Sequence, residues 1–167
     1  DGIIVRFLLA LAALALAACS NNPNVIEPSP LPELEREYKV KRIWKKNAGA
    51  GIEDERVRLQ PAVTGRAVYA ADVEGRVRAF GREKGERLWR RETDHRISGG
   101  VHAGYGMVLF GTREGRVVAL SAETGETLWQ TRVNSEVLTS PVTDGALAVA
   151  QTLDGHVVAP DAAAGSE

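Results

Sequence analysis

Short runs of alternating apolar and polar residues, separated by glycine, predict that this chain is built from β-strands. Val68-Tyr-Ala-Ala71 and Val108-Leu-Phe-Gly111 favour strands, and a Glu-Gly turn follows each of them. The next run alternates, as at Val117 and Ala119, and a second glycine precedes a strand that begins at Leu-Trp. Hairpin turns often need a positive φ, which glycine adopts readily. We therefore expect antiparallel meanders of half-buried strands.

The pattern repeats with a period of 40 residues. One unit runs from Glu74 to Trp89, the next from Glu114 to Trp129, and a third begins at Asp154 and stops after Gly165, before its tryptophan. An earlier, partial unit ends at Trp44, which lies 45 residues before Trp89. The positions that the repeat predicts to be structural are Trp44, Gly75, Gly85, Trp89, Gly115, Gly125, Trp129, Gly155 and Gly165.

Four short strands in 40 residues are typical of a propeller blade. Paired-helix repeats have a similar period, but glycines interrupt every window that is long enough for such a helix. We expect residues 39–167 to form a partial β-propeller of about three four-stranded antiparallel blades. Pro160 stands where the earlier units have Phe80 and Leu120. Proline removes a backbone donor, so the third unit's strand is expected to end there.

The first residues have the layout of an export signal. Twelve apolar residues, from Phe7 to Ala18, follow Arg6 and directly precede Cys19, the chain's single cysteine. A membrane-spanning helix needs about 20 apolar residues, so this run is too short for an ordinary membrane span. The layout is typical of a signal peptide with a helical apolar segment, here residues 1–18. Residues 19–38 contain four of the seven prolines and are expected to be an extended tether.

The tetrad Leu16-Ala17-Ala18-Cys19 resembles the bacterial lipobox. The resemblance implies cleavage after Ala18 and a covalent lipid on Cys19. In such lipoproteins Ser20 permits sorting to the outer membrane, so we expect a lipid-anchored protein on its periplasmic face. A buried or incidental cysteine is the alternative.

Composition excludes several other functions. The chain has 21 Lys and Arg against 22 Asp and Glu, and a net charge of −1 gives nucleic acid no reason to bind. One cysteine and three scattered histidines, His95, His102 and His156, do not have the spacing of a zinc site. No metal site is expected. Asp94, His95 and Ser98 are adjacent in sequence, but a catalytic triad is a matter of geometry, and a polar loop explains them better.

Charge is unevenly distributed along the repeats. Residues 76–96 contain eight basic and four acidic side chains, whereas residues 97–167 contain three basic and eight acidic ones. Two interpretations stay open. The basic stretch is either a patch for an acidic partner or, as we favour, a set of solvated strands and turns.

The unit from Gly115 to Trp129 resembles the pyrroloquinoline-quinone-type propeller repeat. In that family the tryptophan docks on the neighbouring blade, and a ring usually has eight blades. Eight units of this length need about 320 residues. The resemblance therefore implies that the sequence is part of a longer protein with less than half of the ring.

Further segments narrow the resemblance to the BamB family of lipoproteins, in the β-barrel assembly machinery. They are the lipobox, Ser29-Pro-Leu-Pro32, Gly49-Ala-Gly-Ile52, Val68-Tyr-Ala-Ala-Asp72 and Ile97-Ser-Gly-Gly-Val101. This resemblance implies a non-enzymatic scaffold in a Gram-negative bacterium, with no cofactor except the lipid on Cys19. It implies that the scaffold binds the POTRA domains of BamA and assists the folding and insertion of outer-membrane proteins, whose unfolded chains are further expected ligands. The resemblance also implies that the family's main BamA-binding loop falls just beyond Glu167.

Two alternatives remain. A pyrroloquinoline-quinone-dependent dehydrogenase has the same repeat, but such enzymes hold Ca²⁺ and quinone in a central funnel and often have a vicinal cysteine pair. Asp72 aligns with Thr112 and Thr152, so no carboxylate recurs at the position that we expect to face the funnel. The other alternative is a different propeller lipoprotein that binds ligands of the cell envelope.

Overall fold

The computed structural model describes residues 29, 39–52 and 56–165, and those from Lys41 onward belong to one compact unit. The predicted signal peptide, with its helix, and nearly all of the predicted tether lie outside the described residues. Within the described part, no helix is long and apolar enough to cross a membrane.

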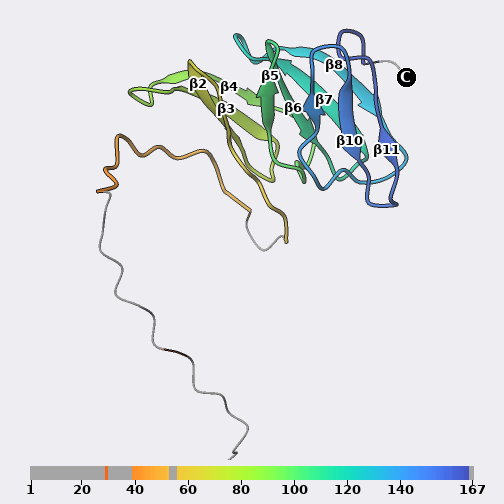
Figure 1. Cartoon of the computed structure of the whole chain (residues 1–167), viewed down its shortest axis with the longest axis horizontal. Helices are drawn as coiled ribbons and strands as arrows, with labels where there is room; N and C mark the ends of the chain where they lie inside the picture. The colour runs from red at the N-terminus through yellow and green to blue at the C-terminus, as the bar shows by residue number, and fades with distance from the viewer. Residues whose placement is uncertain (1–28, 30–38, 53–55, 166–167) are drawn as a thin grey trace, which may run out of the picture. The chain divides into compact units, whose positions relative to one another are not determined.

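The described residues confirm the all-β prediction and the order of strands within a blade. Each of the first two sheets has four antiparallel strands in chain order (Figure 1). The first contains β1 (Ala62–Val63), β2 (Ala67–Ala71), β3 (Arg76–Gly81) and β4 (Arg87–Glu92). The second contains β5 (His102–Gly104), β6 (Met107–Gly111), β7 (Arg116–Ser121) and β8 (Thr127–Arg132). A bulge recurs between the third and fourth strands of both, at Ala79/Phe80 and Ala119/Leu120.

The third sheet has three strands among the described residues, one fewer than predicted. They are β9 (Val142–Thr143), β10 (Ala148–Gln151) and β11 (Val157–Val158). Strand β11 ends two residues before Pro160, as the missing backbone donor of proline predicts. Only an isolated bridge, Leu147 to Asp161, continues the pairing.

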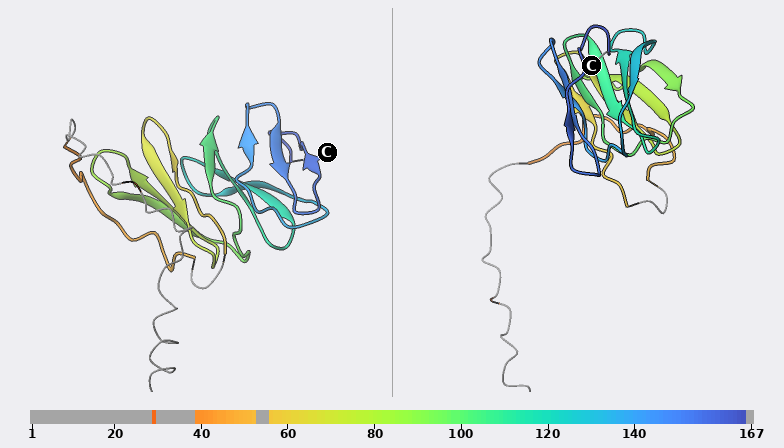
Figure 2. Two further views of the ribbon diagram at one scale, coloured as in Figure 1. Left: turned by 60° about the horizontal axis from the view of Figure 1, so that its bottom comes forward. Right: turned by 90° about the vertical axis from the view of Figure 1, so that its right-hand side faces the viewer.

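The three sheets follow one another face to face (Figure 2), and the middle one is covered on both sides. Val108 and Phe110 of β6 pack against the first sheet, whereas Met107 and Leu109 pack in the cluster that includes the third. All five residues of β6 are buried. The prediction of half-buried strands is therefore wrong for β6 and for β7 (Arg116–Ser121), whose four central residues are also buried. Alternation places side chains on both faces, and here both faces are interfaces.

The segments that lead into β1, β5 and β9 contact one another and so link neighbouring sheets. Val101 N–H donates to the Gln60 carbonyl at 3.1 Å, and the Ser98 hydroxyl donates to the Val137 carbonyl at 2.9 Å. A Cβ on Gly99 would lie 2.2 Å from the Thr139 carbonyl oxygen. Only glycine permits this approach of two backbones.

Candidate functional site

Each repeat tryptophan lies on a turn of the following repeat. Indole Nε1 of Trp44 donates to the Arg82 carbonyl at 2.8 Å, that of Trp89 to Ala122 at 3.0 Å, and that of Trp129 to Ala162 at 2.7 Å. The three acceptors are 40 residues apart. Trp89 is 9% exposed and Trp129 is 8% exposed. The structure therefore places these rings between repeats, where they join one blade to the next.

A glycine beneath each ring makes room for it. A Cβ on Gly125 would lie 2.6 Å from Cε3 of Trp89. A Cβ on Gly85 would lie 2.7 Å from the Trp44 ring, and one on Gly165 would lie 2.7 Å from the Trp129 ring. Each of the six repeat glycines also has φ between 65° and 89°. They are Gly75, Gly85, Gly115, Gly125, Gly155 and Gly165.

Asp72 is the most highly connected buried polar side chain of the described residues. Its carboxylate accepts hydrogen bonds from the backbone N–H groups of Glu74, Arg76 and Ala50, and from Nε of Arg76 at 2.6 Å. Gly49 lies so close to this carboxylate that any side chain there would collide with it. Asp72 thus ties the segment before the first sheet to the β2–β3 turn.

Burial alone would raise the pKa of Asp72, but the hydrogen bonds and the charge of Arg76 outweigh it and lower that pKa. The equivalent residues Thr112 and Thr152 are 0% and 3% exposed, and Asp72 is 0% exposed. The expectation that this position faces a funnel is therefore wrong. In the second sheet the Thr112 hydroxyl accepts the Arg116 N–H at 3.1 Å, so the position stabilises the turn between the second and third strands.

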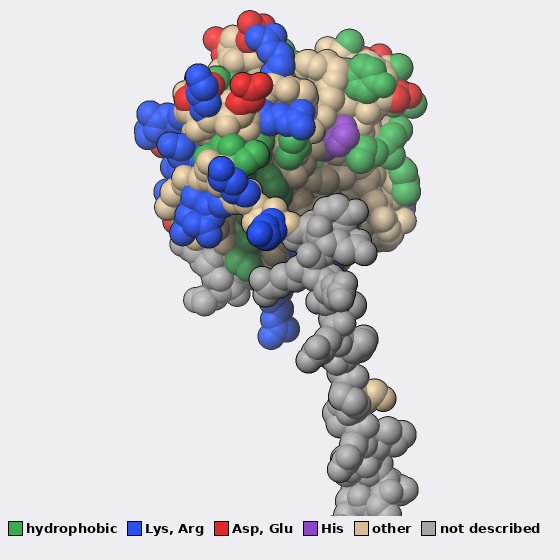
Figure 3. Space-filling model, turned by 60° about the vertical axis from the view of Figure 1, so that its left-hand side comes forward, with side chains coloured by type: hydrophobic (Ala, Val, Ile, Leu, Met, Phe, Trp, Pro, Cys, Tyr) green, Lys and Arg blue, Asp and Glu red, His purple; other side chains and the backbone are tan. Residues whose placement is uncertain are grey.

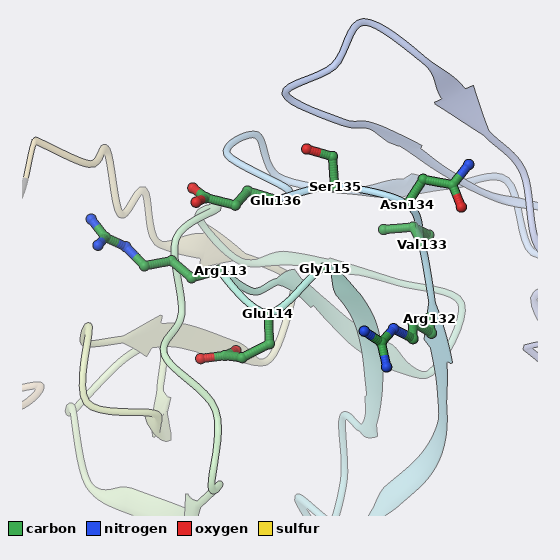
Figure 4. Close-up of a pocket in the computed structure, with 8 residues that line it drawn as sticks. All are labelled: Arg113, Glu114, Gly115, Arg132, Val133, Asn134, Ser135 and Glu136. Carbon is green, nitrogen blue, oxygen red and sulfur yellow. The ribbon is translucent and has the colours of Figure 1, made fainter.

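The β6–β7 turn and the loop after β8 enclose a shallow polar hollow of about 650 Å³ (Figure 4). Glu136 and Arg113 lie at one side of it and Arg132 at the other. Glu114 accepts the Arg96 N–H at 3.3 Å, so this turn also contacts the loop before β5. The full lining is Arg113, Glu114, Gly115, Arg132, Val133, Asn134, Ser135 and Glu136. An open hollow with charges of both signs suits contact with the polar surface of another protein.

The residues that resemble a triad in sequence are not brought together. Ser98 donates to the Val137 carbonyl, while Nε2 of His95 lies 3.0 Å from Oε1 of Gln130. His102 begins β5, and His156 pairs with Asp154 at 3.2 Å. Across the described residues, no three His, Cys, Asp or Glu side chains are grouped as a metal site requires.

Four of the predicted site residues lie outside the described residues, and two features of the structure were not predicted from the sequence. Leu16, Ala17, Ala18 and Cys19 lie outside the described residues, so lipidation stays a prediction. The polar hollow was not predicted, because its two loops are about twenty residues apart in the sequence and meet only when β7 pairs with β8, where Arg116 lies opposite Arg132. The contacts of Asp72 were not predicted either. The departure from threonine at that repeat position was the available signal.

Comparison with known proteins points to one family. The model of the family described as outer membrane protein assembly factor BamB matches residues 73–167. A protein of that name from Pseudomonas aeruginosa is 42% identical over 105 residues, which are 63% of this chain and 28% of the relative. The protein of that name from Escherichia coli is 31% identical over 115 residues, 61% of this chain and 29% of the relative. The chain thus matches less than a third of the length of these relatives.

Solved structures agree on the fold. The crystal structure of BamB from Moraxella catarrhalis has a TM-score of 0.60 and 27% identity, covering 65% of this chain and 33% of that one. A quinohemoprotein alcohol dehydrogenase from Pseudomonas putida has a TM-score of 0.61 at 21% identity, covering 74% and 21%. At that identity the second likeness shows the fold alone.

Proposed function

The chain belongs to the BamB family of outer membrane protein assembly factors, and on that premise we propose that it is a non-enzymatic scaffold of the outer-membrane β-barrel assembly complex. It acts at the periplasmic face of the outer membrane, binds the POTRA domains of BamA and assists the insertion of outer-membrane proteins. The family match over residues 73–167 is the observation that carries this proposal.

The proposed organisation has three parts. Residues 1–18 are a signal peptide that is cleaved before Cys19, residues 19–38 are the lipidated tether, and residues 39–167 are propeller blades. The lipid on Cys19 is the covalent attachment, and the blades work without a cofactor. Buried Asp72 supports this view, since its oxygens already bind Arg76, Ala50 and the β2–β3 turn.

The polar hollow of Figure 4 supports a scaffold role and is our candidate for a contact with a partner domain. Its two arginines and two glutamates can form ion pairs across a protein interface. Calorimetric titration of the full-length protein with purified BamA POTRA domains tests the function. We expect saturable binding that weakens as salt is raised, because salt screens exposed charges. Absence of binding would overturn the proposal.

A charge-reversal variant tests whether the polar hollow is the contact with the POTRA domains. Arg132→Glu reverses one charge of the hollow and should weaken POTRA binding by about tenfold through repulsion. Arg66→Glu, an exposed residue of the β1–β2 turn, is the matched control and should leave binding unchanged. If full-length protein binds and Arg132→Glu binds equally well, the function stands and the contact lies elsewhere.

A further inference from the structure

Docking of Trp44 joins two basic segments that are far apart in the sequence. The Trp44 ring lies 6.2 Å from the ring of Phe80, and its Nε1 donates to the Arg82 carbonyl at 2.8 Å. Nη1 of Arg78 donates to the Asn47 carbonyl at 3.1 Å, which fixes the end of the same segment. Residues 41–46 therefore lie against strand β3 and the β3–β4 turn.

The joined segments form a surface, called here the basic surface, with eight cations and two carboxylates. A hollow of about 300 Å³ between them is lined by Lys46, Arg78 and Arg87 together with Asn47, Phe80 and Gly85. Its lining contains no carboxylate. Figure 3 shows Lys and Arg side chains gathered on this side of the molecule. The cations are Lys41, Arg42, Lys45, Lys46, Arg78, Arg82, Lys84 and Arg87, and the carboxylates are Glu83 and Glu86.

The second repeat shows that the blade does not need these cations. Arg78, Arg82, Lys84 and Arg87 align with Val118, Ala122, Thr124 and Thr127, all of which are uncharged. The second sheet nevertheless has the same strand order, the same register and the same bulge. Apart from the Arg78 hydrogen bond to Asn47, the charges of the first blade are therefore not required by its fold.

Strand pairing shows that one of these cations, Arg78, lies at an unfavourable position. Arg78 stands directly opposite Arg90 in the β3–β4 register, and like charges in such a pair repel each other. Arg90 relieves part of this by pairing with Glu92 at 3.1 Å. In the second sheet the opposed residues are Val118 and Gln130, which have no such conflict.

We propose that the basic surface docks on an anionic phospholipid surface. The inference goes beyond the scaffold function, and it rests on the proposed lipid anchor only for nearness to a bilayer. Each Lys or Arg near such a membrane contributes about 1 kcal/mol of attraction, so several weak contacts suffice without a shaped pocket.

Two observations favour a lipid surface over an acidic protein. Ile43 is 80% exposed between Arg42 and Trp44, and an apolar side chain among cations is typical of proteins that lie on a membrane interface. The basic surface also begins at Lys41, three residues beyond the end of the segment proposed to be the tether. Membrane attachment at Cys19 would keep this surface close to lipid headgroups.

Hydrogen exchange of the full-length chain in vesicles tests the proposal. The protein is reconstituted in phosphatidylcholine vesicles, with or without about a quarter of anionic phosphatidylglycerol, and exchange in residues 41–47 is followed by mass spectrometry. We expect exchange there to be at least about fivefold slower with the anionic lipid, and the difference to vanish in about 0.5 M salt.

The repeat supplies the variant. Arg82→Ala, Lys84→Thr and Arg87→Thr together introduce the residues of the second repeat, which fit the same strands, and they leave the Arg78 hydrogen bond to Asn47 in place. This variant should lose the difference between the two vesicles. The control, Arg58→Ala with Arg91→Ala, removes two exposed cations outside the basic surface and should retain it.

Four outcomes would overturn the proposal. Equally fast exchange in both vesicles, without protection in either, would exclude a lipid contact, and protection that persists in the three-residue variant would exclude these cations. Equal protection in both vesicles would assign the contact to Ile43 and not to the cations. Protection by polyglutamate but not by anionic vesicles would assign the surface to an acidic protein. Intact mass of the same samples reports the lipid on Cys19, so failure of the anchor is distinguished from failure of the docking.

Discussion

The carboxylate of Asp72 fills a position where the other repeats have a threonine hydroxyl, and it makes an additional contact. One oxygen accepts the Arg76 N–H, as the Thr112 hydroxyl accepts the Arg116 N–H. The second oxygen accepts the Ala50 N–H and Nε of Arg76. The side chain is therefore adapted to hold a segment that is special to the first blade.

Asp72→Ala should lower the free energy of unfolding by about 2–3 kcal/mol, because it leaves buried donors without acceptors. Asp72→Thr is the matched control, since threonine occupies this position in the next repeat, and it should cost about 1 kcal/mol. Urea unfolding at pH 7 measures both. Equal losses would show that the hydrogen bond to Ala50 contributes little.

The lowered pKa of Asp72 also predicts a pH dependence. A carboxyl with a lower pKa in the folded state stabilises the fold fully above its unfolded pKa, and this contribution is lost as pH falls through the folded value. We expect the difference in stability between the protein and Asp72→Thr to shrink as pH falls below about 4. Urea unfolding at several acidic pH values checks it. A difference that grows in acid would contradict the lowered pKa.

At the scale of elements, the turn glycines separate two effects that the sequence alone cannot distinguish. Gly125 and Gly155 both have positive φ, at 76° and 89°. A Cβ on Gly125 would collide with Trp89, whereas a Cβ on Gly155 would meet nothing within 4 Å. Both glycines recur with the period, but only one of them makes room for a docked ring.

Gly155→Ala should cost about 1 kcal/mol, the penalty of a left-handed residue with a side chain. Gly125→Ala should cost at least about 1 kcal/mol more, because the added methyl also displaces the indole. Thermal or urea unfolding measures the two changes. Similar costs would mean that the Trp89 ring can shift freely, which would argue against its role in joining the blades.

Trp89→Ala removes the docked ring itself and should cost about 3–5 kcal/mol, as should Trp129→Ala. Trp89→Phe keeps an aromatic ring over Gly125 but loses the hydrogen bond to the Ala122 carbonyl. Loss of that bond should add about 1 kcal/mol to the cost of replacing the indole by a smaller ring. Melting curves of the variants give the comparison. An unchanged melting temperature for Trp89→Ala would instead suggest a surface role for the ring.

The period of glycine and tryptophan predicted the strands and their order, and Pro160 predicted the early end of β11. The period could not predict that β6 and β7 are covered on both faces, because burial on the second face depends on a sheet that is distant in sequence. Nor could it show that residues 41–47 lie against Arg78 and Arg82. That contact depends on where the Trp44 ring docks, so the basic surface became visible only in three dimensions.

At the scale of the whole molecule, the lipobox predicts how the protein is processed. If the tetrad that ends at Cys19 is cleaved and modified, the mature chain begins at an acylated Cys19, and its intact mass equals residues 19 onward plus lipid. Cys19→Ser should abolish both the cleavage and the lipid. A mature amino terminus elsewhere, or a free thiol at Cys19 in cells that process lipoproteins, would contradict the membrane assignment.

The stacking of the sheets predicts a gradient of local stability in the 167-residue chain. Opening the middle sheet must separate two apolar interfaces, one that includes Phe110 and one that includes Leu109, whereas opening the third sheet separates one. Val157 of β11 is 68% exposed, although its counterparts Val77 and Val117 are fully buried. We therefore expect amides of β6 and β7 to exchange slowest, those of β2 and β3 at intermediate rates, and those of β10 and β11 fastest.

Native-state hydrogen exchange measures this order, and one substitution tests its cause. Leu109→Ala, which removes a side chain only from the cluster shared with the third sheet, should speed exchange in β10 by more than in β2. Phe110→Ala faces the first sheet and should do the reverse. Equal effects of both changes on β2 and β10 would mean that the three sheets open as a single cooperative unit, and that each interface is too strong to yield by itself.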